Sequence, residues 1–202
     1  MKTFFPQKPL LITLEQPLFK ELELRQDCVA EKKYNGTRLV LKRFADHYEF
    51  WNRSGEVLKY NPPKELIDQL NKVAWEGTCI ADGELLHFKT KHIKNTIVLF
   101  DLLLWNDESV TEKPFIERRA LLEKACGDLF VAPQFKGGTE GCFRNMYDTF
   151  TKLDEIEGIV MKSLGAKHKL GRTESPVVAW NWKVRKPGPS YRGGENWRHD
   201  DD

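Results

Sequence analysis

The sequence predicts an α+β fold in which mixed, mainly antiparallel sheets are flanked by helices. The chain has 202 residues, 40% of them hydrophobic, which is enough for one domain with a sizeable core. Short β-rich segments bounded by turn residues outnumber the helical ones. Strands and helices do not alternate regularly, as they would in a parallel βαβ sheet. We therefore expect one domain over residues 1–187, followed by a polar tail over residues 188–202.

The first half of the chain is expected to form mostly strands. Apolar segments rich in β-branched and aromatic residues predict strands at residues 28–33, 38–44, 47–51, 78–88 and 96–105. The last of these is apolar enough to be buried on both faces. Asn35-Gly36 and Ala45-Asp46 are typical of tight turns between strands. Pro62-Pro63 should precede a helix, in which apolar residues recur at helical spacing at Leu66, Ile67, Leu70 and Val73.

The second half mixes helices and strands. Pro114 is expected to begin a second helix. We expect its inner face to carry Ile116, Ala120, Leu121 and Leu122, and its outer face mostly Glu117, Arg118, Arg119 and Glu123. A third helix is expected at residues 143–153. The remaining predicted strands lie at residues 129–135, 158–162 and 177–185.

The composition disfavours several classes of protein. No apolar segment approaches the roughly 20 residues that span a bilayer, and Pro6 and Pro9 interrupt the N-terminal segment where a signal peptide would need a continuous apolar stretch. We therefore expect an intracellular protein, in the cytoplasm or at the nucleoid or nucleus, without a membrane partner. The four cysteines form no CxxC pair and the five histidines no HxxxH pair, which disfavours zinc and Ser-His-Asp chemistry.

The charge is distributed unevenly, although the net charge is only +2. Residues 162–186 carry seven basic side chains against one acidic, and residues 31–60 carry seven against four. Such local excesses suit a polyanion, either a nucleotide or a nucleic-acid backbone. A solvated charged face fits this pattern equally well.

Four polar segments stand out within the predicted strands. In a strand, alternate side chains share a face, so Glu31 and Lys33 should point to one side, and Lys183 and Arg185 likewise. Asp82-Gly83-Glu84 and the residues 157–162 interrupt or end apolar strands. Taken singly, each segment is also typical of an ordinary hairpin end or a solvated edge strand.

Together and in this order, the segments resemble the covalent nucleotidyltransferase superfamily, which comprises polynucleotide ligases and messenger RNA capping enzymes. Lys33-Tyr34-Asn35-Gly36 resembles the KxDG nucleophile motif. The other matches are Asn52-Arg53-Ser54-Gly55 to SRNG, Asp82-Gly83-Glu84 to the third motif, Phe100-Asp101-Leu102-Leu103 to the base-packing element, residues 157–162 to EGIVxK and Lys183-Val184-Arg185 to KxK. ERRALLE at residues 117–123 is similar to a helix of ATP-dependent DNA ligases. The resemblance covers residues 9–187 and implies an ATP-grasp-like nucleotidyltransferase domain.

The resemblance implies a role for each matching residue. Lys33 would be the nucleophile; a free lysine has a pKa of about 10.4 and must lose its proton more easily to attack phosphorus. Lys183 and Arg185 would supply cations that favour this loss and neutralise the α-phosphate. The nucleotide contacts would come from Glu31 and Glu84 to the base and ribose, Phe100 by stacking, Arg38 and Lys162 to phosphate and sugar, and Glu157. Glu157 and Glu84 are the candidate ligands for Mg²⁺ or Mn²⁺, and Arg53 and Arg38 would grip the nucleic acid.

The implied function is ATP-dependent ligation of nicked or broken nucleic acid through a lysyl-AMP intermediate. DNA is the preferred strand. RNA is the alternative, since Asn35 replaces the usual Asp, as it does in some RNA ligases. Guanylyl transfer ranks third, and a domain that only binds nucleotide or nucleic acid is a further alternative. Only about sixteen residues follow Lys186, too few for an OB-fold domain, so the chain would be a minimal enzyme, would use a separate OB-fold partner, or would be part of a longer protein. We expect a monomer.

Overall fold

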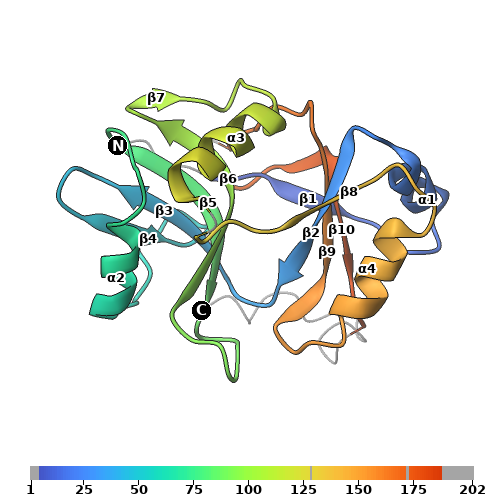
Figure 1. The fold of residues 1–202 in the computed structure, drawn as a ribbon, viewed down its shortest axis with the longest axis horizontal. Coiled ribbons are helices and arrows are strands. Elements are labelled where there is room, and N and C mark those ends of the chain that lie inside the picture. Colours follow the sequence, from blue (N-terminus) through green and yellow to red (C-terminus); the bar gives the residue numbers. More distant parts are fainter. Residues whose placement is uncertain (1–4, 128, 172, 188–202) are drawn as a thin grey trace.

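The structure is a computed structural model that describes residues 5–127, 129–171 and 173–187 (Figure 1). It contains two five-stranded sheets. Sheet 1 has the order β1 (Lys8–Leu11), β10 (Val177–Arg185), β9 (Ile156–Ser163), β2 (Cys28–Tyr34) and β8 (Gln134–Lys136). Sheet 2 has the order β4 (Tyr48–Trp51), β3 (Thr37–Arg43), β5 (Cys79–Leu86), β6 (Thr96–Trp105) and β7 (Glu108–Ser109). Every pairing is antiparallel except that of β1 with β10.

Each sheet has its own pair of helices and its own apolar core. Helices α1 (Pro17–Leu24) and α4 (Cys142–Phe150) lie beside sheet 1, and α2 (Lys64–Leu70) and α3 (Phe115–Cys126) lie beside sheet 2 (Figure 1). The first core joins Phe19 and Leu22 of α1 to Phe143 of α4 over the sheet. The second joins Leu66 and Leu70 of α2 to sheet 2 and to apolar residues of α3. The sheet faces that point away from these two cores carry the polar side chains of the site described below.

The predicted fold class is confirmed, and most strands fall where the pattern placed them. The strand at residues 177–185 and the strand at residues 96–105 have the predicted bounds. Three short elements, β1, α1 and β7, were not predicted, because four or fewer strand residues or two helical turns give little periodicity. The strand predicted at residues 129–135 is wrong for most of its length: β8 begins only at Gln134. The predicted tail at residues 188–202 lies outside the described residues.

The orientation predicted for α3 is wrong. Ile116, expected inside, is 53% exposed, and Ala120 is also exposed. Arg118 and Arg119, expected outside, are buried, with only 1% and 5% of their surfaces exposed. The buried stripe runs through Phe115, Arg118, Arg119, Leu122, Ala125 and Cys126. This stripe has regular helical spacing, but a hydrophobicity pattern assigns arginine to the solvent side.

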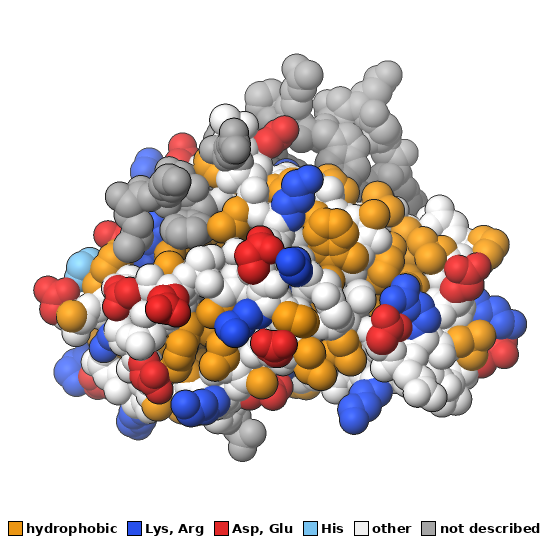
Figure 2. Space-filling model, turned by 90° about the horizontal axis from the view of Figure 1, so that it is seen from above, with side chains coloured by type: hydrophobic (Ala, Val, Ile, Leu, Met, Phe, Trp, Pro, Cys, Tyr) orange, Lys and Arg blue, Asp and Glu red, His pale blue; other side chains and the backbone are white. Residues whose placement is uncertain are grey.

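Among the described residues, no helix is both long and apolar enough to span a membrane. Basic and acidic side chains are interspersed on the face seen from the β7 and α3 side (Figure 2). The basic excess at residues 162–186 is partly internal, since Lys162 is buried and Lys183 half-buried. Net charge along the sequence therefore does not translate directly into a basic surface.

Candidate active site

The turn between β2 and β3 connects the two sheets next to Lys33. Lys33 is the penultimate residue of β2, and its side chain is 16% exposed. Gly36 lies against β5, where a Cβ atom would come within 2.7 Å of Glu84 Cγ and of the Leu85 carbonyl oxygen. The Gly36 N–H donates to Glu84 Oε1 at 3.2 Å. Glycine is required here for close approach, and it brings the nucleophile candidate of sheet 1 beside the carboxylate of sheet 2.

The register of sheet 1 gathers the cationic candidates on one face. Lys33 pairs with Gly158 across β2 and β9, and Gly158 pairs with Arg185 across β9 and β10. Two residues further along β9, Val160 pairs with both Glu31 and Lys183. Directly opposed residues project to the same side of a sheet. The face that carries the predicted nucleophile therefore also carries both residues of the predicted KxK motif.

A β-bulge turns Glu157 toward Lys33. The pairing steps from Lys33 opposite Gly158 to Tyr34 opposite Ile156, so Glu157 is an extra residue on β9. A bulge of this kind re-aims one side chain. The Lys33 Nζ forms an ion pair with Glu157 Oε1, and Arg185 Nη2 lies 3.9 Å from the same oxygen. Simple alternation would have placed Glu157 on the opposite face, with the apolar core.

The pKa values of the two central lysines are both lowered. Burial is the largest cause for Lys33, and the nearby charge of Arg185 adds to it, whereas Glu157 and Glu84 oppose it. Burial also lowers the pKa of Lys183, to about 8, and Arg185 and Lys33 act in the same direction. Mutual repulsion of cations and loss of solvation are the two effects that ease deprotonation of a lysine. The cluster thus has the electrostatics that a lysine nucleophile needs.

Sheet 2 supplies a second group of polar side chains. Arg38 stands opposite Glu84 in the register, and its Nε donates to Asp82 Oδ1 at 2.5 Å. Burial raises the pKa of Asp82, although the charge of Arg38 opposes this. Burial also raises the pKa of Glu84, against the effect of Lys33 and Arg38. Glu84 therefore interacts electrostatically with a cation of each sheet, Lys33 of sheet 1 and Arg38 of sheet 2.

A second bulge presents Phe100. The pairing of β5 with β6 steps from Asp82 opposite Asp101 to Gly83 opposite Leu99, which makes Phe100 the extra residue on β6. Its ring is half-buried. The guanidinium carbon of Arg38 lies 4.9 Å from the ring centroid, and the Nζ of Lys162 lies 4.8 Å from it. Cations over an aromatic face are a favourable arrangement, and the same ring is the predicted stacking partner of a base.

Lys162 lies with the base-recognition candidates and away from Lys33. Its Nζ forms an ion pair with Glu31 Oε2 at 2.6 Å and donates to the Phe100 carbonyl oxygen at 3.2 Å. On β9 it is four residues beyond Gly158, the partner of Lys33, which is about 13 Å along a strand. The structure therefore groups Lys162 with Glu31 and Phe100, not with the phosphate candidates Lys33, Lys183 and Arg185.

Two arginines of α3 complete this part of the site, and the sequence-based assignment missed both. Arg119 Nη1 and Gln134 Nε2 donate to Glu31 Oε1 at 3.1 and 2.9 Å. Arg118 makes two hydrogen bonds of 2.8 Å to the Asp101 carboxylate, next to Phe100. The available signal was the helical spacing of the two arginines with Phe115 and Leu122.

Arg53 lies apart from these groups, in the turn that follows β4. The turn is closed by Asn52, whose Oδ1 accepts hydrogen bonds from the backbone N–H groups of Ser54 and Glu56 at 2.9 and 3.0 Å. Arg53 is exposed, and its carbonyl oxygen accepts a hydrogen bond from Ser175 Oγ at 3.4 Å. Its position on an exposed turn suits contact with a large ligand such as a strand.

The carboxylates fit the pattern by which proteins hold Mg²⁺. This ion is commonly bound by one or two carboxylates, with substrate phosphates and water completing its shell. Glu157 and Glu84 are such a pair, since both interact with Lys33. Among the described residues, no group of three or more His, Cys, Asp or Glu side chains forms a site for a metal held by protein alone. The donor set thus fits an ion that arrives with a nucleotide.

Comparisons with known proteins find that this chain is similar to DNA ligases. The family model described as "ATP dependent DNA ligase domain" matches residues 86–178, just under half of the chain. DNA ligase 1 of Methanosarcina acetivorans is 24% identical over 88% of this chain and 36% of its own length. A probable DNA ligase of Aquifex aeolicus is 30% identical over 59% of this chain and 24% of its own. The solved structure of a mycobacterial DNA ligase D, complexed with ATP and MES, has a TM-score of 0.65 and 18% identity, and covers 89% of this chain and 60% of that one.

The described residues therefore share the fold of this DNA ligase D structure. More particularly, the resemblance to the adenylation domain of ATP-dependent DNA ligases is confirmed by the family model and by the structural neighbours. The chain spans about a third or less of the length of the two curated relatives described above.

Proposed function

We propose that this chain is the catalytic domain of an ATP-dependent DNA ligase, in which Lys33 accepts AMP from ATP. The observation that carries the proposal is the Lys33 environment: a lysine of lowered pKa paired with Glu157 and facing Lys183 and Arg185. A matched family model of ATP-dependent DNA ligases and relatives named DNA ligase support the choice of ATP and DNA.

The first step would use these residues as follows. Neutral Lys33 attacks the α-phosphorus of ATP; the N–P bond forms as the P–O bond to pyrophosphate breaks. Glu157, the ion-pair partner of Lys33, is placed to receive the ammonium proton. Lys183 and Arg185 stabilise the negative charge that develops on the phosphate oxygens. Glu31 and Phe100 would hold the base, and Glu84 the ribose.

Glu157 and Glu84 would hold Mg²⁺, which neutralises phosphate charge when bound. In the later steps, the 5′-phosphate of the broken strand displaces Lys33 from AMP, forming a P–O–P bond as the N–P bond breaks. A 3′-hydroxyl then forms the phosphodiester bond and AMP leaves. Arg53, on its exposed turn, would contact the strand.

RNA ligation is the second candidate, because Asn35 stands where the motif of DNA ligases has Asp. The Asn35 backbone N–H donates to the Glu155 carbonyl oxygen at 2.8 Å, which fixes the backbone of the turn. Only the side chain at this position therefore differs between the DNA ligase and RNA ligase motifs. The rates at which one preparation seals nicked DNA and nicked RNA distinguish the two candidates.

The proposal is tested by covalent labelling with α-labelled ATP and Mg²⁺. We expect label that survives denaturation in the native protein and in Lys32→Ala, and none in Lys33→Ala. Lys32 is the matched control, since it lies on the opposite face of β2, over the ring of Phe150 at 4.0 Å. Lys183→Ala should slow labelling much more than Arg53→Ala, because Arg53 acts on the strand. Full labelling of Lys33→Ala, or label from GTP alone, would refute the proposed chemistry.

A further inference from the structure

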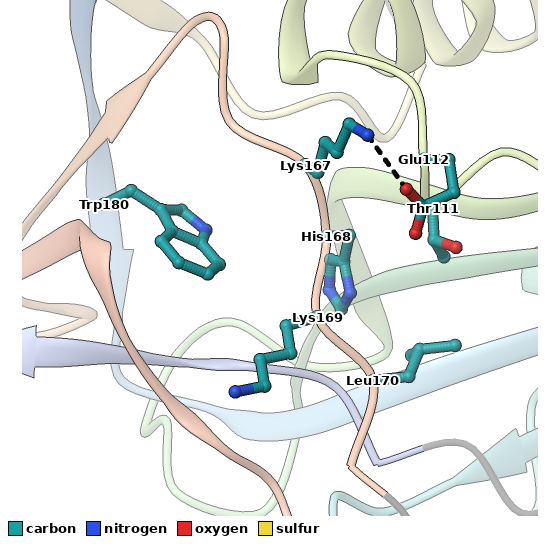
Figure 3. Close-up of a pocket in the computed structure, with 7 residues that line it drawn as sticks. All are labelled: Thr111, Glu112, Lys167, His168, Lys169, Leu170 and Trp180. Carbon is teal, nitrogen blue, oxygen red and sulfur yellow. Dashed lines mark hydrogen bonds and ion pairs between the residues drawn. The ribbon is translucent and has the colours of Figure 1, made fainter.

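A cavity of about 400 Å³ is lined by none of the residues predicted for the active site. It is bounded by the loop that joins β9 to β10 and by Trp180 of β10. Figure 3 shows the indole of Trp180 facing the imidazole of His168 across this space, with the side chain of Lys169 extending below the indole. Lys167 borders the cavity on another side, where it is 3.0 Å from Glu112.

Two of these side chains carry buried polar atoms without a protein partner. The side chain of His168 is only 1% exposed, yet neither ring nitrogen has a hydrogen-bond partner among the described residues. The same holds for Trp180 Nε1. Buried polar atoms are nearly always hydrogen-bonded, because burial removes the water that would otherwise bond them. His168 Nε2 lies on the side of Asp82, so Trp180 Nε1 and the rest of the His168 imidazole are the unpartnered polar groups that border the cavity, and they indicate a polar ligand.

The lining includes the Thr111 hydroxyl and the Glu112 carboxylate, which is paired with Lys167; the other polar groups are mostly hydrogen-bond donors. An indole N–H only donates, and an ammonium group only donates. Burial lowers the pKa of His168 to about 3, so the ring is neutral at neutral pH and offers one N–H donor and one acceptor. Lys169 is exposed, and its ammonium forms no ion pair within the part of the chain that the structure describes. A compact oxyanion matches this set of donors.

The cavity is connected to the predicted strand-binding surface. Leu170, which lines the cavity, packs in one apolar cluster with Trp51 of β4, two residues before Arg53, and the Ser175 hydroxyl hydrogen-bonds the backbone of Arg53. On its inner side, His168 Nε2 lies 4.0 Å from Asp82 Oδ2, the partner of Arg38. The imidazole thus separates the cavity from the nucleotide site. An oxyanion in the cavity would lie across His168 from Asp82 of the nucleotide site, on the side of the strand that leads to Arg53.

We propose that this cavity binds a backbone phosphate of a nucleic-acid strand, with Trp180, His168 and Lys169 as its donors. The proposal deepens the proposed function and rests on it for the identity of the strand. The same chemistry would accept free phosphate, so the test must distinguish a phosphodiester from the free ion.

Binding of a nicked DNA duplex, measured across a range of salt concentrations, tests the proposal. Trp180→Phe keeps the ring and removes only the donor, and it should weaken binding about tenfold, the usual effect of one hydrogen bond to a charged group. Lys169→Ala should lower the salt dependence by about one phosphate contact. Lys20→Ala is the matched control, since this exposed lysine on α1, beside sheet 1, pairs with the exposed Glu140 and does not line the cavity. It should leave binding unchanged.

The indole N–H resonance of Trp180, assigned by its absence in Trp180→Phe, reports the contact directly. It should shift with the duplex and not with inorganic phosphate at the same phosphate concentration. A shift with inorganic phosphate alone, or unchanged duplex binding in Trp180→Phe and Lys169→Ala, would overturn the proposal. Labelling of Lys33 with ATP, measured in parallel, should be the same in both variants. If ATP does not label the native protein, the proposed function is wrong. The duplex-binding and resonance measurements would still show whether the cavity binds a strand phosphate.

Discussion

Helices α3 and α4 cover the two sheets in the same way but bury different chemistry. The buried residues of α4 are Phe143, Met146 and Tyr147, which pack on the apolar core of sheet 1. At the equivalent turn, α3 buries Arg118 and Arg119 and directs them to Asp101 and Glu31. One helix therefore only stabilises its sheet, whereas the other also fixes carboxylates at the candidate active site.

The difference shows that α3 positions candidate site residues without itself supplying a predicted catalytic residue. Asp101 follows Phe100, and Glu31 lies two residues before Lys33, so the arginines hold residues close in sequence to the candidate stacking residue and the candidate nucleophile. Burial raises the pKa of Asp101, but the hydrogen bonds and charge of Arg118 outweigh it and the pKa is lowered. Charges buried in this way must be paired, which makes the arrangement specific and costly to disturb.

The largest effect is expected from Arg118→Ala. It would leave the Asp101 carboxylate buried without its partner, and unfolding by urea should show a loss of about 3–5 kcal/mol. Replacing both partners, as in Arg118→Met with Asp101→Leu, should recover most of that loss, because no charge then remains buried. If the double variant were as unstable as Arg118→Ala, shape complementarity rather than charge pairing would be the function of Arg118.

A smaller and more specific effect is expected from Arg119→Met. Glu31 would keep Gln134 and Lys162 as partners but lose one charged donor, so the KM for ATP in labelling should rise about tenfold with little change in the rate at saturation. Met146→Ala in α4 is the contrasting variant: it should lower stability by about 2–5 kcal/mol and leave the KM unchanged. Equal effects of both variants on the KM would remove the distinction between the two helices.

The smallest effect is expected from Ile116→Ser. The side chain is 53% exposed on the outer face of α3, so the free energy of unfolding should change by no more than about 0.5 kcal/mol. Leu122→Ala, on the buried stripe of the same helix, should cost about 2–5 kcal/mol. A large loss in Ile116→Ser would restore the orientation that the sequence pattern predicted.

Local rules in the sequence were sufficient for much of the fold. The period-two apolar segments placed most strands. Alternation along β2 put Glu31 and Lys33 on one face, and alternation along β10 put Lys183 and Arg185 on one face, as the structure shows. These predictions succeed because side-chain direction in a regular strand depends only on residue parity.

Three features were decided only by the tertiary structure. Glu157 and Phe100 each reach the site through a bulge, and a bulge depends on how many residues two distant strands pair, which no single segment encodes. The buried face of α3 is set by Asp101 and Glu31, partners 17 and 88 residues away in sequence, which make burial of arginine favourable. The sequence by itself identified most of the candidate residues; long-range pairing determined which of them meet, because register and charge compensation arise between segments and not within them.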